Sequence, residues 1–138
     1  MADQWTLKGR VLSGAKRGAF FTQLEWVQDQ CLTKLGFRPY AGTLNIEVQE
    51  ECVPSIEELQ KARGIELIPP DPQFCSGKTL HADIGGVSGA LIIPEEEVRV
   101  HGKRILEVMA GIGLKDALNL KDGDIVTLVV KKPSPEKE

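Results

Sequence analysis

The most informative stretch of this chain is residues 35–48, Leu35-Gly36-Phe37-Arg38-Pro39-Tyr40-Ala41-Gly42-Thr43-Leu44-Asn45-Ile46-Glu47-Val48. The stretch predicts a helix end at Gly36, a turn, and a strand over 43–49. Side chains of a strand alternate between two faces, so Thr43 and Asn45 share the face opposite Leu44 and Ile46. Two neutral oxygen-bearing side chains beside a buried strand suit a hard cation whose charge phosphate balances. Taken alone, the alternation is more commonly explained by a strand with one face in water.

Glycine and proline divide the rest of the chain into short elements. Strands are expected at 5–11, 19–21, 79–84, 89–93, 105–110 and 125–130. Thr22 with Glu25, and Ser55 with Glu58, are expected to cap two helices that end at Gly36 and Gly64, and a third helix is expected at 114–118. Because the strands do not alternate with helices of about 10–15 residues, the pattern predicts a mainly β fold, a closed antiparallel barrel of about six strands with two or three short helices.

Composition limits the class of protein. The 138 residues fit one domain, expected over 1–131, with a polar tail at 132–138 expected to be disordered. The net charge of −3 argues against a broad basic surface for nucleic acid, and no apolar run approaches the roughly 20 residues of a membrane span. Three scattered cysteines and an N-terminus without a signal-peptide pattern favour a cytoplasmic protein.

Two glycine-containing segments invite a phosphate-binding interpretation. Ser76-Gly77-Lys78-Thr79 resembles the end of a P-loop, but the first glycine of that pattern would fall at Pro72 and a strand follows. A surface turn is the better interpretation there. In the loop from Gly14 to Gly18, backbone N–H groups can converge on an anion beside Lys16 and Arg17. Taken alone, that loop is better explained as a simple hairpin turn with solvated basic side chains.

Glu107 is the one carboxylate in the apolar strand 105–110. A carboxylate among apolar neighbours is costly unless it is paired or functional, although a strand end open to solvent explains it as well. His81 and His101 have no neighbours at the spacing of metal ligands, and no Ser/His/Asp set is visible. An enzyme built this way would act by positioning and charge stabilisation, as phosphoryl transfer does.

Several motifs occur together and in a fixed order. They are the run Leu35–Val48, the earlier Val11-Leu12-Ser13-Gly14…Gly18…Phe21, and the later 89–94, 106–110, Leu114 and 118–124. With them the chain resembles the archaeal CTP-dependent riboflavin kinase family from about residue 8 to 131. The resemblance implies a six-stranded cradle-loop barrel that transfers the γ-phosphate of CTP to the 5′-hydroxyl of riboflavin, giving FMN and CDP.

The same resemblance implies the site residues and their ligands. Mg²⁺ is held by Thr43 and Asn45. Glu107 contacts the flavin, and a role for it as the base toward the ribityl hydroxyl is a hypothesis. Glu97 lies nearest to the position of a flavin-contacting threonine. The nucleotide contacts are Gly14, Ala15, Lys16, Arg17, Gly18 and Ala19 in the glycine loop, and Ile112, Gly113, Leu114 and Lys115 after the Glu107 strand.

The expected partners are a small-molecule nucleotide and a flavin, with no nucleic acid, no membrane and a monomer favoured. Where the family has Ala-Pro and then Leu-Arg after the glutamate strand, this chain has Ala110-Gly111 and Leu114-Lys115. Lysine offers a point charge in place of a planar fork. These departures leave open a non-catalytic flavin- or nucleotide-binding module on the same barrel. A DNA-binding regulator is disfavoured, because the chain has no basic stripe. Preference between CTP and ATP stays open.

Overall fold

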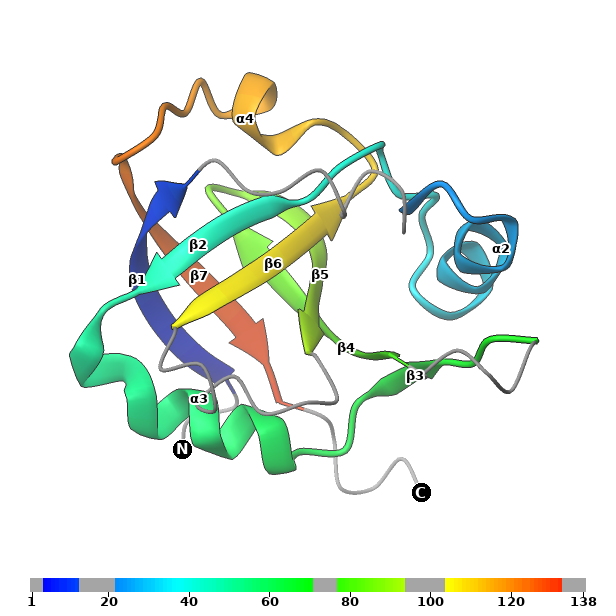
Figure 1. The fold of residues 1–138 in the computed structure, drawn as a ribbon, viewed down its shortest axis with the longest axis horizontal. Coiled ribbons are helices and arrows are strands. Elements are labelled where there is room, and N and C mark those ends of the chain that lie inside the picture. The colour runs from blue at the N-terminus through cyan, green and yellow to red at the C-terminus, as the bar shows by residue number, and fades with distance from the viewer. Residues whose placement is uncertain (1–3, 13–21, 71–76, 94–103, 133–138) are drawn as a thin grey trace.

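Six antiparallel strands close a barrel in the computed structural model, which describes residues 4–12, 22–70, 77–93 and 104–132 (Figure 1). Around the barrel the order is β4-β5-β6-β2-β1-β7, and pairing of β4 with β7 closes it. The strands are β1 (Gln4–Leu12), β2 (Leu44–Val48), β4 (Gly77–Ile84), β5 (Val87–Ile93), β6 (Ile105–Ala110) and β7 (Ile125–Lys131). The predicted barrel is confirmed.

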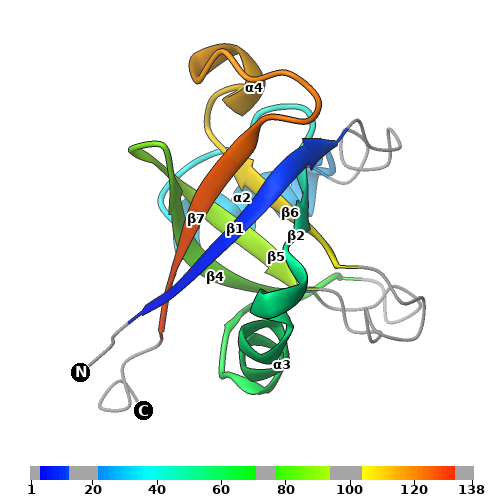
Figure 2. The same ribbon diagram turned by 90° about the vertical axis from the view of Figure 1, so that its left-hand side faces the viewer.

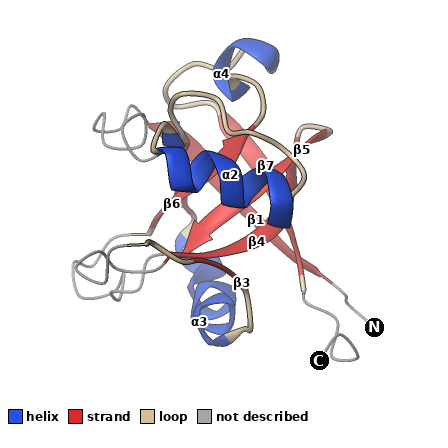
Figure 3. Cartoon of the chain, turned by 90° about the vertical axis from the view of Figure 1, so that its right-hand side faces the viewer, coloured by secondary structure: helices blue, strands red, loops and turns tan. Residues whose placement is uncertain are grey.

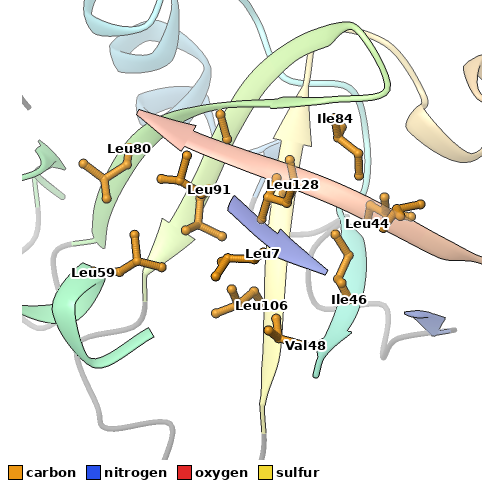
Figure 4. Packing of buried hydrophobic residues seen from close by; sticks show 14 of the residues in the cluster. Leu7, Leu44, Ile46, Val48, Leu59, Leu80, Ile84, Leu91, Leu106 and Leu128 are labelled. Carbon is orange, nitrogen blue, oxygen red and sulfur yellow. The ribbon is translucent and has the colours of Figure 1, made fainter. Parts of the chain in front are cut away.

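The barrel interior is filled by the alternate residues of each strand. Leu44, Ile46 and Val48 are buried in the main core, as the alternation in β2 predicts. Leu7, Leu106 and Leu128 meet them from three other strands, and Leu59 covers one end (Figure 4). Burial of one such side chain contributes about 1.5–3 kcal/mol relative to exposure, so this interior fixes the register of every strand.

The described residues form three short helices outside the barrel. They are α2 (Glu25–Lys34), α3 (Val53–Lys61, after the 3₁₀ turn Glu50–Cys52) and α4 (Leu114–Ala117). Figure 2 shows α3 and α4 at opposite ends of the barrel, and Figure 3 shows α2 lying across its outer surface. Val27 and Cys31 of α2 pack on Met109 of β6 in a second apolar cluster. No described helix is long and apolar enough to cross a membrane.

Both predicted helix caps are wrong. Helix α2 begins at Glu25 after Leu24, without a side-chain cap, because the buried Thr22 hydroxyl instead accepts a hydrogen bond from the Gly42 N–H. Helix α3 begins at Val53, two residues before the expected cap Ser55, with a proline in its first turn. It ends at Lys61, ahead of Gly64. The predicted stop at Gly36 is confirmed by its φ of 91°.

A seventh strand was missed by the sequence pattern. Strand β3 (Ile65–Leu67) is only three residues long and pairs with β4 alone. Its other edge is closed by α2: the Gln30 amide bonds both the N–H and the C=O of Ile68, and Lys34 Nζ donates to the Glu66 carbonyl. Side chains thus take the place of a neighbouring strand on this edge.

The remaining strand boundaries differ little from the prediction. Strand β5 starts at Val87 rather than Gly89, after a two-residue turn in which Gly85 and Gly86 have φ of 57° and 87°. The expected strand at 19–21 and residues 133–138 of the expected tail lie outside the described residues.

Candidate functional site

Thr43, Asn45 and Glu107 lie together on one surface of the barrel. Asn45 of β2 is directly opposite Glu107 of β6, and Thr43 Oγ1 donates a 2.7 Å hydrogen bond to Glu107 Oε1. The core residues Leu44, Ile46, Leu106 and Val108 alternate with them, so the polar side chains face away from the barrel interior. All three are half-buried. The expected metal pair and the expected flavin contact therefore form one cluster.

The hydrogen bond between Thr43 and Glu107 prepares the threonine oxygen as a ligand. A hydroxyl has one donor and two acceptor lone pairs, and the Thr43 proton is directed at the carboxylate. A metal ion would bind at the oxygen lone pairs, and a carboxylate behind a ligand raises the basicity of that ligand. Thr43 oxygen and the Asn45 amide oxygen fit Mg²⁺, which accepts one or two protein oxygens together with waters and phosphates. The described residues contain no cluster of three or more His, Cys, Asp or Glu side chains that could replace such a site.

A cavity of about 170 Å³ adjoins Thr43, where β2 begins and β6 ends. It is bounded by Thr43 and the turn before it on one side and by the segment after β6 on the other. Its lining residues are Tyr40, Ala41, Gly42, Thr43, Leu44, Val108, Ala110, Ile112, Gly113, Leu114, Lys115 and Asp116. The structure thus brings the four residues Ile112–Lys115 to the same cavity as Thr43. Asn45 and Glu107 stand next to this cavity rather than in its wall.

The turn that carries Thr43 is held in place by α2. Both N–H groups of the half-buried Gln28 amide are used, one on the Thr22 carbonyl at 2.7 Å and one on the Pro39 carbonyl at 2.8 Å. The backbone N–H of Tyr40 donates to the Ala110 carbonyl at 2.7 Å. The wall of the cavity is therefore fixed both to helix α2 and to the end of β6.

The expected glycine loop, Gly14, Ala15, Lys16, Arg17, Gly18 and Ala19, lies outside the described residues, but the residues that flank it are placed. Leu12, at its start, pairs directly with Asn45. Thr22, after its end, accepts the Gly42 N–H. Both flanks therefore lie beside the Thr43–Asn45 pair. Glu97 also lies outside the described residues.

Lys115 is exposed at the edge of the cavity, where its ammonium bonds Asp122 at 2.8 Å. An ion pair this exposed is weak, so the ammonium can exchange Asp122 for a more highly charged partner. Lys78 of the rejected P-loop has a different role. Its Nζ donates to the Gln60 and Ala62 carbonyls at the end of α3, in the wall of a separate, shallower cavity of about 550 Å³.

Two residues of this site were missed by sequence reasoning. Tyr40 is the single tyrosine of the chain and falls inside the motif 35–48, which is a signal that could have identified it. Gln28 has no such signal, because a glutamine on an amphipathic helix is ordinarily a solvated residue. Its role depends on the position of the Pro39 carbonyl, which only the folded chain defines.

Comparison with known proteins adds independent information. Residues 11–130 match the family profile named for CTP-dependent riboflavin kinase and described as a domain of unknown function, DUF120. Among similar curated proteins, the riboflavin kinase of Pyrobaculum aerophilum is 40% identical over 131 residues, which cover 90% of this chain and 60% of that protein. The riboflavin kinase of Archaeoglobus fulgidus is 38% identical over 128 residues, covering 90% of this chain and 54% of that protein.

A shorter relative is matched almost from end to end. The riboflavin kinase of Methanobrevibacter smithii is 35% identical over 123 residues, covering 88% of this chain and 97% of that protein. The chain therefore spans about 60% or less of the longer relatives and nearly all of the shorter one. The profile match and this full-length similarity agree with each other on the family. The chain belongs to the CTP-dependent riboflavin kinase family.

Proposed function

We propose that this chain is a CTP-dependent riboflavin kinase, which transfers the γ-phosphate of CTP to the 5′-hydroxyl of riboflavin and forms FMN and CDP. The supporting observation is the cluster of Thr43, Asn45 and Glu107, in which a hydrogen bond joins residues 64 positions apart. The cavity between Thr43 and Ile112–Lys115 adjoins that cluster. Family membership supports the reaction class, and the cavity beside the cluster supports this location for the reaction.

Each residue has a defined task in this proposal. Thr43 and Asn45 hold Mg²⁺, which would neutralise charge on the nucleotide phosphates. Lys115 leaves Asp122 and binds a phosphate oxygen as a point charge. Glu107 accepts the proton of the riboflavin 5′-hydroxyl, whose oxygen bonds to the γ-phosphorus as the bond to the β-bridging oxygen breaks. Backbone N–H groups of 14–19 bind phosphate oxygens, and Glu97 contacts the flavin.

The setting of the reaction is part of the proposal. The nucleotide and the flavin bind to a single domain over 1–131, which functions as a monomer in the cytoplasm. The scattered cysteines agree with a reducing compartment, since Cys31 and Cys52 are both free thiols.

The test is the conversion itself. Purified protein is incubated with riboflavin, Mg²⁺ and one of CTP, UTP, ATP or GTP, and FMN and the nucleoside diphosphate are separated by chromatography. FMN and CDP should form in equal amounts, fastest with CTP. Binding of both ligands without FMN would instead identify a non-catalytic flavin- or nucleotide-binding module. Faster reaction with ATP would contradict the CTP assignment alone.

A further inference from the structure

We propose that the ring of Tyr40 is the stacking platform for the base of the bound nucleotide. This inference rests on the proposed function and deepens it, because it assigns the base a contact and states what that contact does. Tyr40 lies in the wall of the 170 Å³ cavity that adjoins Thr43, on the side facing Gly113.

The exposure of Tyr40 is unusual for the described part of the chain. Five large apolar or aromatic side chains are exposed there, and only Tyr40, at 50%, and Ile112, at 48%, line this cavity. The other three, Leu32, Ile68 and Ile125, do not line it. An aromatic and an aliphatic side chain, both left half in water at the mouth of one cavity, provide apolar surface for a ligand ring.

The ring is held in position before any ligand arrives. The Tyr40 N–H donates to the Ala110 carbonyl at 2.7 Å, and the preceding Pro39 carbonyl accepts from Gln28 at 2.8 Å. A Cβ at Gly113 would lie 3.1 Å from both Cε2 and Cζ of the ring, so the ring rests directly on the Gly113 backbone. A tyrosine has only two side-chain torsions, and ordering it against a fixed backbone costs little entropy on binding.

Size and location favour the nucleobase over the flavin. Ligand pockets usually measure about 300–1,000 Å³, so a cavity of about 170 Å³ accepts a single nucleobase rather than a whole ligand. Gly113 belongs to the segment expected to contact the nucleotide. Glu107, the expected flavin contact, stands outside the cavity wall. The flavin is therefore placed on the outer surface by Glu107, and the base is placed by Tyr40.

A stacking platform has a particular effect on selectivity. Every base has a π-face, and stacking on an aromatic side chain contributes about 1–3 kcal/mol whichever base is present. Tyr40 should therefore strengthen the binding of CTP, UTP and ATP by a similar factor. The choice of cytosine then rests on other groups, such as the backbone of Ile112–Lys115.

The experiment compares Tyr40→Leu with wild type in titrations of CTP, UTP, ATP and inorganic tripolyphosphate, each with Mg²⁺. The variant should bind the three nucleotides at least about fivefold more weakly, a change equivalent to the lower limit for stacking, and should bind tripolyphosphate as wild type does. Tyr40→Phe should restore nucleotide binding. Gly113→Ala, whose new methyl displaces the ring, should reproduce part of the loss. Ile68→Ala, an equally exposed site away from the cavity, is the control for general surface effects.

The outcomes separate the platform from the reaction. Equal nucleotide affinity in wild type and Tyr40→Leu would overturn the platform, and so would a loss confined to riboflavin affinity. An equal loss of affinity for tripolyphosphate would also overturn it, because that loss would show that the substitution disturbs the phosphate site. Wild type that binds nucleotide through Tyr40 but forms no FMN would leave the platform standing and refute the kinase. Wild type that binds no nucleotide would refute both.

Discussion

The hydroxyl of Thr43 donates a 2.7 Å hydrogen bond to the carboxylate of Glu107. This single contact links the residue expected to hold the metal with the residue expected to touch the flavin. A proton acceptor and a phosphate-binding cation must both lie within contact distance of the reacting hydroxyl for phosphoryl transfer. In the proposed reaction, the two substrates would meet beside this bond.

Glu107→Gln should lower kcat by about 100-fold or more, because the amide cannot accept the riboflavin proton. Its carbonyl oxygen still accepts the Thr43 hydroxyl, so the melting temperature should not fall. Steady-state rates of FMN formation give kcat and KM separately, with Glu66→Gln, an exposed carboxylate on β3, as the control. An unchanged kcat with a raised KM for riboflavin would show that Glu107 binds flavin without taking its proton.

Asn45→Ala should lower turnover at least tenfold, a loss of more than about 1.4 kcal/mol in transition-state stabilisation. The reason is the lost amide oxygen, so a higher Mg²⁺ concentration should restore part of the rate. Glu47→Ala is a matched control, since Glu47 lies two residues along the same face and forms an ion pair with the exposed Arg10. Full activity of Asn45→Ala, in protein of unchanged melting temperature, would remove Asn45 from the metal site.

Lys115→Met should raise the KM for CTP about tenfold with little change in folding. Its ion pair with Asp122 is about half exposed on both sides, so the pair contributes at most about 1 kcal/mol to stability. Asp122→Asn removes the competing carboxylate and should leave the KM for CTP equal or lower. A KM for CTP that rises in both variants would show that the pair itself, rather than a free ammonium, shapes the site.

Gln28→Leu should destabilise the protein by about 1–3 kcal/mol, because the carbonyls of Thr22 and Pro39 each lose the hydrogen bond from the Gln28 amide. The wall that carries Tyr40 and Thr43 should loosen with it and raise the KM for CTP. Gln23→Leu is the control, since its bond to the same Pro39 carbonyl is 3.5 Å long and its side chain is exposed. Chemical denaturation measures both variants, and equal stability of the two would deny Gln28 a positioning role.

Cys31 should make folding sensitive to alkaline pH. Burial raises the pKa of its thiol from 9.0 to about 11. Between these values the unfolded chain releases the proton and the folded chain keeps it, so the free energy of unfolding falls as pH rises. Over the two pH units the loss is at most about 2–3 kcal/mol. Cys31→Ala should therefore show a shallower decline between pH 9 and 11 than wild type, and parallel curves would contradict this pKa.

The sequence by itself determined the barrel and most of its elements. The alternation in β2 and the apolar sequence of β6 identified both as strands from local sequence alone. A period of two also shows which face of a strand is buried. Gly36 predicted the end of helix α2, because the residue that ends a helix often has a left-handed backbone conformation, which glycine adopts most readily. Resemblance over nearly the whole chain then predicted the family, which the comparisons confirm.

Tertiary structure decided what the polar side chains do. The sequence around Thr22 is typical of a helix cap, but the Thr22 hydroxyl accepts a hydrogen bond from the Gly42 N–H. The sequence around Lys78 resembles a phosphate-binding loop, but the Lys78 ammonium donates to carbonyls at the end of α3. From the sequence, the Glu107 carboxylate could be exposed to solvent or paired with another group. The pairing of β6 with β2 places it within hydrogen-bond distance of the Thr43 hydroxyl. A hydrogen bond depends on where a second atom lies in space, to within a few tenths of an ångström. Local sequence sets the period of a strand, but the position of a distant partner is set only when the whole barrel closes.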